Sequence, residues 1–406
     1  MFGPDVDSSL FRVTSFVDFG TGSFPQSMIQ LPDLSIAIQT SPGFTSGAIL
    51  RFVDADLNGV ADGPGVPIYT SPVGEGPLTQ LAQAGSFFIQ GNYGARSIVV
   101  LDSSMAEVGR LEFDYGPDLW WHDTIGLAVR PTPGQPGSYD LVFNVGSEFD
   151  NLPSSKPVGL SGLVAPTALN PDSLYMVTLG LQDGAPVGVS NLRQVASGIR
   201  NVFGMGFDAA GNFWFSENAM DGDPFPPQAE ELNQIPVALL NALQAGTPGT
   251  LPPDFGFPNC FPSYFTGAPT GSGCGPSITS PIQAFTPFLS TLYSQGATQI
   301  AFAPSDFPAP FNHGIFIAFA GNPAGERNPL IFYDLDTGTY THFLLGGTGS
   351  IRQTGLLSTN SSLFISDFLS GEVFQITAGG VPEPGGLGLV AFGLSVIALL
   401  RRRRAF

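Results

Sequence analysis

Residues 202–218 read VFGMGFDAAGNFWFSEN, and this stretch decides the expected fold. Apolar and polar residues alternate on both sides of a central turn, which is the period-two pattern of two antiparallel strands in a hairpin. Similar units recur along the chain, beginning at Ser27, Leu78, Thr124, Val202, Ala297 and Ile351. Several are followed by further strand-like segments, including GAILRFVDAD, RSIVVLD, PLIFYDLD and GEVFQI.

Six such units, each of about four short strands, predict an all-β six-bladed β-propeller over residues 1–378. A sandwich of two sheets is the alternative fold. The 52 glycines and 37 prolines fit many short strands joined by turns. Helical periodicity is scarce, and Pro236–Gln244 is the best helix candidate. A second region, residues 379–406, is expected to follow the propeller and to contain a short hydrophobic helix.

The charge balance excludes one class of partner. Residues 1–380 hold 10 basic and 32 acidic residues, a net charge of −22. Glu383 and the four arginines near the end lie after this part of the chain. Such an acidic surface repels the phosphates of nucleic acid, so we expect no nucleic-acid binding.

The two cysteines, Cys260 and Cys274, flank a loop rich in Gly, Pro and Ser. We interpret them as a disulfide formed in an oxidising compartment, with two unpaired thiols as the alternative. Their spacing fits no zinc site. The first residues show no basic or apolar segment typical of a secretory signal, so a signal is expected upstream of this start or already removed.

The last 26 residues read VPEPGGLGLVAFGLSVIALLRRRRAF. Residues 387–400 are apolar or glycine, which is short for the roughly 20 residues of a membrane span, and the arginines after them are expected to stay cytoplasmic. This layout resembles the PEP-CTERM sorting signal of bacteria that produce exopolysaccharide. The matching positions are Val381, Pro382, Glu383, Pro384, Arg401, Arg402, Arg403 and Arg404.

The resemblance implies an exported protein of a Gram-negative-type bacterium, held transiently in the inner membrane through residues 387–400. An exosortase would be its partner, cleaving near Pro382–Pro384 and leaving the protein at the cell surface or in the extracellular matrix. A permanent membrane anchor is the alternative.

The most specific part of the propeller region begins at Arg200 and ends at Pro258. It resembles the glucose/sorbosone dehydrogenase family, which are six-bladed propellers that oxidise sugars with pyrroloquinoline quinone (PQQ). An Arg-Asn pair, a strand ending in Glu-Asn, an acidic-acidic-Leu-Asn segment and a Gly-aromatic-Pro turn follow one another. The matching residues are Arg200, Asn201, Glu217, Asn218, Glu230, Asn233, Gly256 and Pro258.

Two further stretches extend the resemblance. WWHDTIGLAVRP, from Trp120 to Pro131, matches the blade that carries the catalytic base, which makes His122 the candidate base. SIRQTGLLSTNSSLFISD matches the final blade and makes Arg352 a cofactor-binding candidate beside Arg200, Asn201 and Asn218. Arginines can pair with the carboxylates of PQQ, and a histidine that is neutral near pH 7 can accept a proton. A packed histidine and arginines in salt bridges between blades are the alternatives.

The chain also departs from this family. Ala219–Met220 replaces a glycine-proline turn, a Pro-rich insertion precedes Glu230, and Arg327 stands where a cofactor-contacting lysine is expected. The sequence therefore supports two alternative functions. One is a quinoprotein that oxidises a sugar or a sugar-derived aldehyde. The other is a non-catalytic propeller that binds a sugar or polysaccharide, or has a structural role, in the exopolysaccharide matrix.

A possible metal loop lies in the segment DADLNGVAD, residues 54–62. Oxygen-bearing side chains recur at Asp54, Asp56, Asn58 and Asp62, and Gly59 permits a sharp bend, as in the first nine positions of an EF-hand calcium loop. The twelfth position is Gly65, so the usual bidentate Glu is missing. We expect weak calcium binding, with a solvated acidic turn as the alternative.

Overall fold

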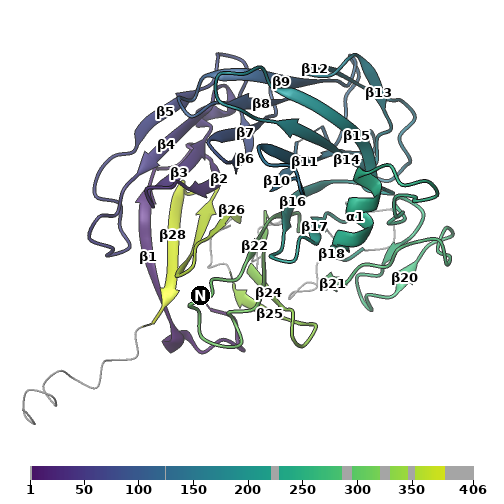
Figure 1. The fold of residues 1–406 in the computed structure, drawn as a ribbon. Helices are drawn as coiled ribbons and strands as arrows, with labels where there is room; N and C mark the ends of the chain where they lie inside the picture. The colour runs from purple at the N-terminus through teal and green to yellow at the C-terminus, as the bar shows by residue number, and fades with distance from the viewer. Residues whose placement is uncertain are drawn as a thin grey trace, which may run out of the picture.

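The computed structural model describes residues 2–123, 125–220, 228–285, 295–320, 330–345 and 353–379. Within these residues, six antiparallel sheets are arranged in a ring around a central axis, as Figure 1 shows. The prediction of an all-β six-bladed propeller is thus confirmed, and the sandwich is excluded. The sequence-predicted C-terminal helix lies outside the described residues.

Blades 1 and 2 come from the first part of the chain. Blade 1 consists of β2 (Pro25–Gln30), β3 (Ile36–Thr40), β4 (Ala48–Phe52) and β5 (Val66–Thr70). Blade 2 begins with β6 (Leu78–Ala84), β7 (Phe87–Asn92), β8 (Ser97–Leu101) and β9 (Glu107–Asp114). Two short 3-10 helices, η1 (Ser8–Leu10) and η2 (Pro42–Phe44), lie before and within this region.

Blade 2 is wider than the expected four strands. The hairpin of β12 (Val158–Gly162) and β13 (Thr167–Leu169) adds to its outer edge, where β12 pairs with β9. In the sequence, this hairpin lies between two strands of blade 3. Val158 and Leu160 pack into the same apolar cluster as Phe113, so burial of apolar surface explains the extension.

Blades 3 and 4 surround the stretch that suggested the fold. Blade 3 consists of β10 (Leu127–Pro131), β11 (Ser138–Val145), β14 (Ser173–Gly180) and β15 (Gly188–Ser197). Blade 4 consists of β16 (Val202–Phe207), β17 (Phe213–Glu217), β18 (Glu230–Ile235) and β21 (Gln283–Phe285). The predicted helix is confirmed as α1 (Val237–Gln244), with Pro236 at its N-cap position.

Blades 5 and 6 complete the ring. Blade 5 consists of β22 (Ala297–Phe302), β23 (Gly314–Phe319), β24 (Leu330–Asp334) and β25 (Thr339–Leu344). Blade 6 consists of β26 (Gln353–Ser358), β27 (Ser362–Asp367), β28 (Glu372–Ala378) and β1 (Phe11–Asp18). Because β1 comes from the other end of the chain and pairs antiparallel with β28, the two ends of the propeller are tied together.

Each of the six expected strand pairs forms the two inner strands of one blade. The inner strands β2, β6, β10, β16, β22 and β26 contact one another in a closed ring. Phenylalanines fill the space between blades: Phe11, Phe307 and Phe343 meet edge-to-face near the closure, with Phe316 and Phe332 beside them. Such contacts add to the burial of apolar area and account for the high phenylalanine content.

The predicted disulfide is also present. Cys260 and Cys274 are bonded, and they close a loop that contains the short hairpin of β19 (Phe261–Pro262) and β20 (Pro269–Thr270). None of the helices in the described ranges is both long and apolar enough to cross a membrane. The sorting-signal residues 381–384 and 401–404, and the hydrophobic run 387–400, lie outside the described residues.

Candidate functional site at the mouth of the channel

A cavity of about 280 Å³ opens at the end of the channel where the inner strands begin. Its walls come from five of the six blades and consist mainly of residues at the start of inner strands. The lining includes Gln26, Thr79, Tyr93, Asn201, Phe203, Asn218, Ala297 and Thr298. In a propeller, the loops that enter equivalent strands of the blades meet at this end.

The channel is closed one residue deeper by glutamines. The Nε2 group of Gln299, on β22, donates to Oε1 of Gln80, on the opposite strand β6, at 2.6 Å. Gln80 in turn donates to the carbonyl of Phe203, and Gln299 accepts from the backbone of Leu356. A ligand in the cavity would therefore lie on a polar floor rather than enter an open channel.

His122 is held in the loop that leads into β10. The indole nitrogen of Trp120 donates to the carbonyl of Tyr115 at 2.7 Å, and Asp123 forms an ion pair with Arg96 at 2.7 Å. The Arg96 guanidinium lies over the ring of Tyr115. These contacts fix both sides of His122, whose residue is 6% exposed.

The hydrogen bonds of Ser147 assign the tautomer of His122. The Ser147 hydroxyl donates to the carbonyl of Phe149 at 2.7 Å, so its oxygen is left to accept from Nδ1 of His122, also at 2.7 Å. Nδ1 therefore carries the proton, and Nε2 keeps its lone pair. Burial, together with the charge of Arg200, lowers the pKa of His122 from 6.5 to about 2. The imidazole is neutral at physiological pH.

Arg200 lies next to His122 and is almost fully buried. Its guanidinium pairs with the carboxylate of Asp150, donates to the Asp150 carbonyl at 3.0 Å and donates to the Asn218 carbonyl at 3.3 Å. Its backbone N–H donates to Glu217 at 2.6 Å. The alternative of a structural salt bridge is thus supported for this arginine, although Asp150 belongs to a loop of blade 3 that sequence reasoning did not single out.

Three of the sequence-predicted site residues are brought to one end of the propeller. Asn201 and Asn218 line the cavity directly. His122 does not line the cavity; its neighbour Asp123 lies close enough to the cavity residue Tyr93 that its charge, after burial, helps to raise the pKa of Tyr93. Arg200 directly precedes Asn201 in the sequence and is not part of the cavity lining. Arg352 and Arg327 lie outside the described residues.

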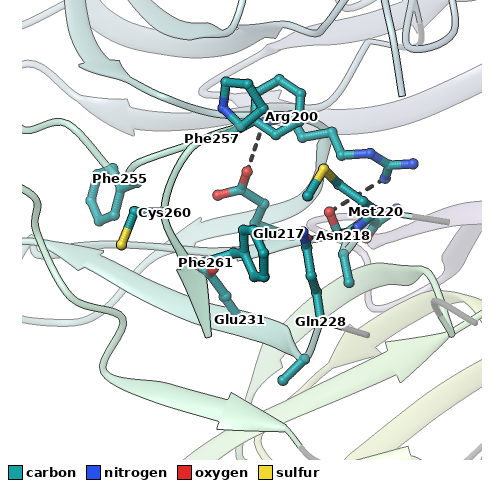
Figure 2. A pocket seen from close by; sticks show the side chains of 13 residues that line it. Arg200, Glu217, Asn218, Met220, Gln228, Glu231, Phe255, Phe257, Cys260 and Phe261 are labelled. Carbon is teal, nitrogen blue, oxygen red and sulfur yellow. Dashed lines mark hydrogen bonds between the residues drawn. The ribbon is translucent and has the colours of Figure 1, made fainter. Parts of the chain in front are cut away.

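A group of buried carboxyl groups lies near Arg200, and Figure 2 shows two of them, Glu217 and Glu231. Glu217, Glu230 and Glu231 are 6%, 4% and 8% exposed. Burial first, and then the charge of Glu231, raises the pKa of Glu217 well above its ordinary value. Burial raises the pKa of Glu231 to about 7, and the charge of Glu230 adds to this effect. The sequence signal for this group was the pair of acids within the strand-like EELNQI.

The proposed calcium loop connects β4 and β5. Its carboxylates accept hydrogen bonds from the amides of their own turn: Asp54 from Asn58 and Gly59, and Asp62 from Ala55. The side chains of Asp56 and Asn58 bond each other at 2.9 Å. In the part of the chain that the structure describes, no group of three or more His, Cys, Asp or Glu side chains is placed to hold a metal ion. Calcium binding here stays a prediction.

Fold and site together define a six-bladed propeller with a mostly apolar cavity above a pair of hydrogen-bonded glutamines, and with a neutral, buried histidine in a neighbouring loop. Solved structures of similar fold include the holo form of the PQQ domain of pyranose dehydrogenase from Coprinopsis cinerea (TM-score 0.59, 16% identity, 90% of this chain and 95% of that one). A Trichoderma reesei structure of carbohydrate-active enzyme family AA12 gives a TM-score of 0.63 at 14% identity, over 93% and 98% of the two chains.

The PQQ-bound form of aldose sugar dehydrogenase from Streptomyces coelicolor gives a TM-score of 0.52 at 15% identity, over 90% of this chain and 98% of that one. At these identities the likeness shows a shared fold. Neither a protein-family model nor a curated protein sequence matches the chain.

The described residues of the cavity meet one requirement of PQQ and leave another unmet. Oδ1 of Asn218 is buried without a hydrogen-bond partner among the described residues, so it can accept from an N–H or O–H group of a ligand. The carboxylates of PQQ call for cations, yet the described lining of the cavity holds no Lys or Arg. Arg200 is already paired with Asp150. Arg352, the cofactor-binding candidate that directly precedes β26 in the sequence, lies outside the described residues.

Proposed function

We propose that the protein is a quinoprotein that oxidises a sugar or a sugar-derived aldehyde at the mouth of the channel. The state of His122 carries the proposal most directly. Ser147 holds Nδ1–H, burial and Arg200 keep the ring neutral, and Nε2 is left as a base. A base for removing the proton of a substrate hydroxyl must start unprotonated, as His122 does, while its low pKa makes Nε2 a weak base.

Bound PQQ would supply the two-electron acceptor for such an oxidation. Asn201 and Asn218 would hold neutral polar groups in the cavity, and Arg352 would pair with a carboxylate. His122 would accept the substrate proton at Nε2, while Ser147 keeps the ring in the required orientation. The glutamine floor would keep the ligand at the channel mouth.

Reconstitution tests the proposal. The purified protein is titrated with PQQ in the presence of calcium, with cofactor uptake followed by absorbance and turnover by dye reduction with aldoses. His122→Ala should abolish turnover and retain uptake. His313→Ala is the matched control, because His313 has an exposed side chain and pairs with Asp336 at the blade 5 surface. No uptake of PQQ by the wild type would refute the proposal.

A non-catalytic propeller is the second candidate. The paired state of Arg200 favours it, because a cofactor carboxylate would have to compete with Asp150 for the guanidinium. For this candidate, oligosaccharide binding at the channel mouth without quinone uptake is the expected result, and Asn218→Ala should weaken it.

Export, exosortase processing near 382–384 and surface display are proposed from the terminal sequence. Mass spectrometry of the C-terminus of protein isolated from its native cell tests this. Cleavage close to Pro384 is expected, whereas a native chain that ends with Arg401–Arg404 intact would contradict processing.

A further inference from the structure

A second cavity, of about 250 Å³, lies away from the channel mouth, between β18 and the disulfide-closed loop. Its inner wall is buried: Phe255 is 4% exposed, Cys260 6% and Glu231 8%. Its rim is exposed and includes Pro269, Cys274, Gly275 and Ser280. The cavity is therefore a pocket that opens outward and ends at a carboxyl group, and most of its remaining lining is apolar.

Glu231 has unused hydrogen-bonding capacity in this pocket. Its Oε2 accepts from Nδ2 of Asn233 at 3.0 Å. Among the described residues, no partner is found for Oε1, although the side chain is more than nine-tenths buried. Oε1 keeps some accessible surface in the pocket, so an N–H group of a ligand can reach it and donate to it.

The other charges of this region are already satisfied by the protein. Glu230 accepts three backbone N–H groups, from Ala219, Gln295 and Gly296. Arg200 pairs with Asp150 and donates its backbone N–H to Glu217.

Glu231 thus faces two neighbouring carboxyl groups without a cation of its own among the described residues. The electrostatic surroundings of the pocket favour a positively charged ligand.

Aromatic side chains strengthen this preference. Phe255 and Phe261 line both the pocket and the small cavity that extends from Glu231 to Glu217; Figure 2 shows them in the small cavity. Aromatic rings attract ammonium groups and also accept the apolar body of a ligand. Since a cavity of about 150 Å³ holds one benzene molecule, this pocket has room for a substituted ring or a chain of similar size.

We propose that this pocket binds a small organic ammonium compound, with its charged nitrogen on Glu231 and its apolar body against Phe255, Phe261 and the disulfide. The site is distinct from the channel-mouth cavity and does not depend on the function proposed there. The acidic surface of the protein would raise the local concentration of such cations.

The test uses the full chain and benzylamine as the probe, with benzyl alcohol as the uncharged analogue. Binding is measured by calorimetry and by ligand-observed NMR at 150 mM salt. Saturable 1:1 binding of benzylamine is expected, with a clear preference over benzyl alcohol. Affinity should increase between pH 5.5 and pH 8, because Glu231 loses its proton over this range.

Glu231→Gln keeps the side-chain size and should weaken benzylamine binding about tenfold, while leaving benzyl alcohol binding unchanged. Ser280→Trp, at the exposed rim, should block the binding of both ligands. Because Ser280 is exposed, this variant tests the pocket even if Glu231→Gln does not fold. Glu112→Gln, an exposed glutamate on β9, is the matched control and should bind like the wild type.

Absence of saturable binding to the wild type would overturn the proposal. Equal benzylamine affinity in the wild type and in both pocket variants would also overturn it, because such binding would reflect the general negative charge of the surface.

Discussion

Replacing Glu231 by Gln should stabilise the protein at alkaline pH and change its stability little at acid pH. Glu231 is buried, and its pKa is raised from 4.5 to about 7. The folded protein therefore holds this proton more tightly than the unfolded chain, and stability is lost as pH rises from about 4.5 to about 7. At roughly 1.4 kcal/mol per pH unit, the loss amounts to about 3 kcal/mol.

Gln has nearly the same shape as Glu, cannot ionise, and can still accept the hydrogen bond from Asn233. We expect Glu231→Gln to lie within about 1 kcal/mol of the wild type at pH 5 and to exceed it by about 3 kcal/mol at pH 8. Removing this charge also removes one cause of the raised pKa of Glu217, which acts in the same direction.

The assay is urea unfolding followed by tryptophan fluorescence at both pH values, with Glu112→Gln as the exposed control. A variant that is no more stable than the wild type at pH 8 would refute the reasoning. A gain of equal size at pH 5 and pH 8 would also refute it, because ionisation could not then be the cause.

Three further predictions follow from the site and the blade contacts. Asp140→Ala should lower the free energy of unfolding in urea by about 3–5 kcal/mol, because it leaves Arg130 charged and buried beside α1. A loss of less than about 1 kcal/mol would contradict this. Calorimetric titration of calcium should give weak binding that Asp56→Ala removes, and identical isotherms would eliminate the site in loop 54–62. If the protein is a quinoprotein, the pH profile of kcat/KM should show no inflection near pH 6.5, since the pKa of His122 is about 2. Ser147→Ala should lower kcat, because the His122 ring loses the hydrogen bond that orients it.

The blades were predictable because strand alternation is a local property. The units starting at Leu78 and Val202 each carry their own turn and their own apolar face, so the inner strands could be read without knowledge of their neighbours. Closure by β1, and the transfer of β12 and β13 to blade 2, depend on contacts between distant segments. No local pattern in the sequence indicates such pairings.

The same difference between local and long-range features applies to the candidate site. The location of His122 and Asn201 at one end of the channel was predictable, because the family resemblance places both before inner strands and topology brings such places together; their roles stay predictions. The pairing of Arg200 with Asp150 and the second cavity at Glu231 were not predictable, because each joins segments that are distant in sequence. They bear directly on function, since they determine which charges remain available to a ligand.

Titration of the purified protein with PQQ and calcium, followed by dye reduction with aldoses, tests the central claim most directly. The account predicts stoichiometric uptake of the quinone and aldose-dependent reduction that His122→Ala abolishes and His313→Ala preserves. Failure of the wild type to take up the quinone, or full activity of His122→Ala, would contradict it.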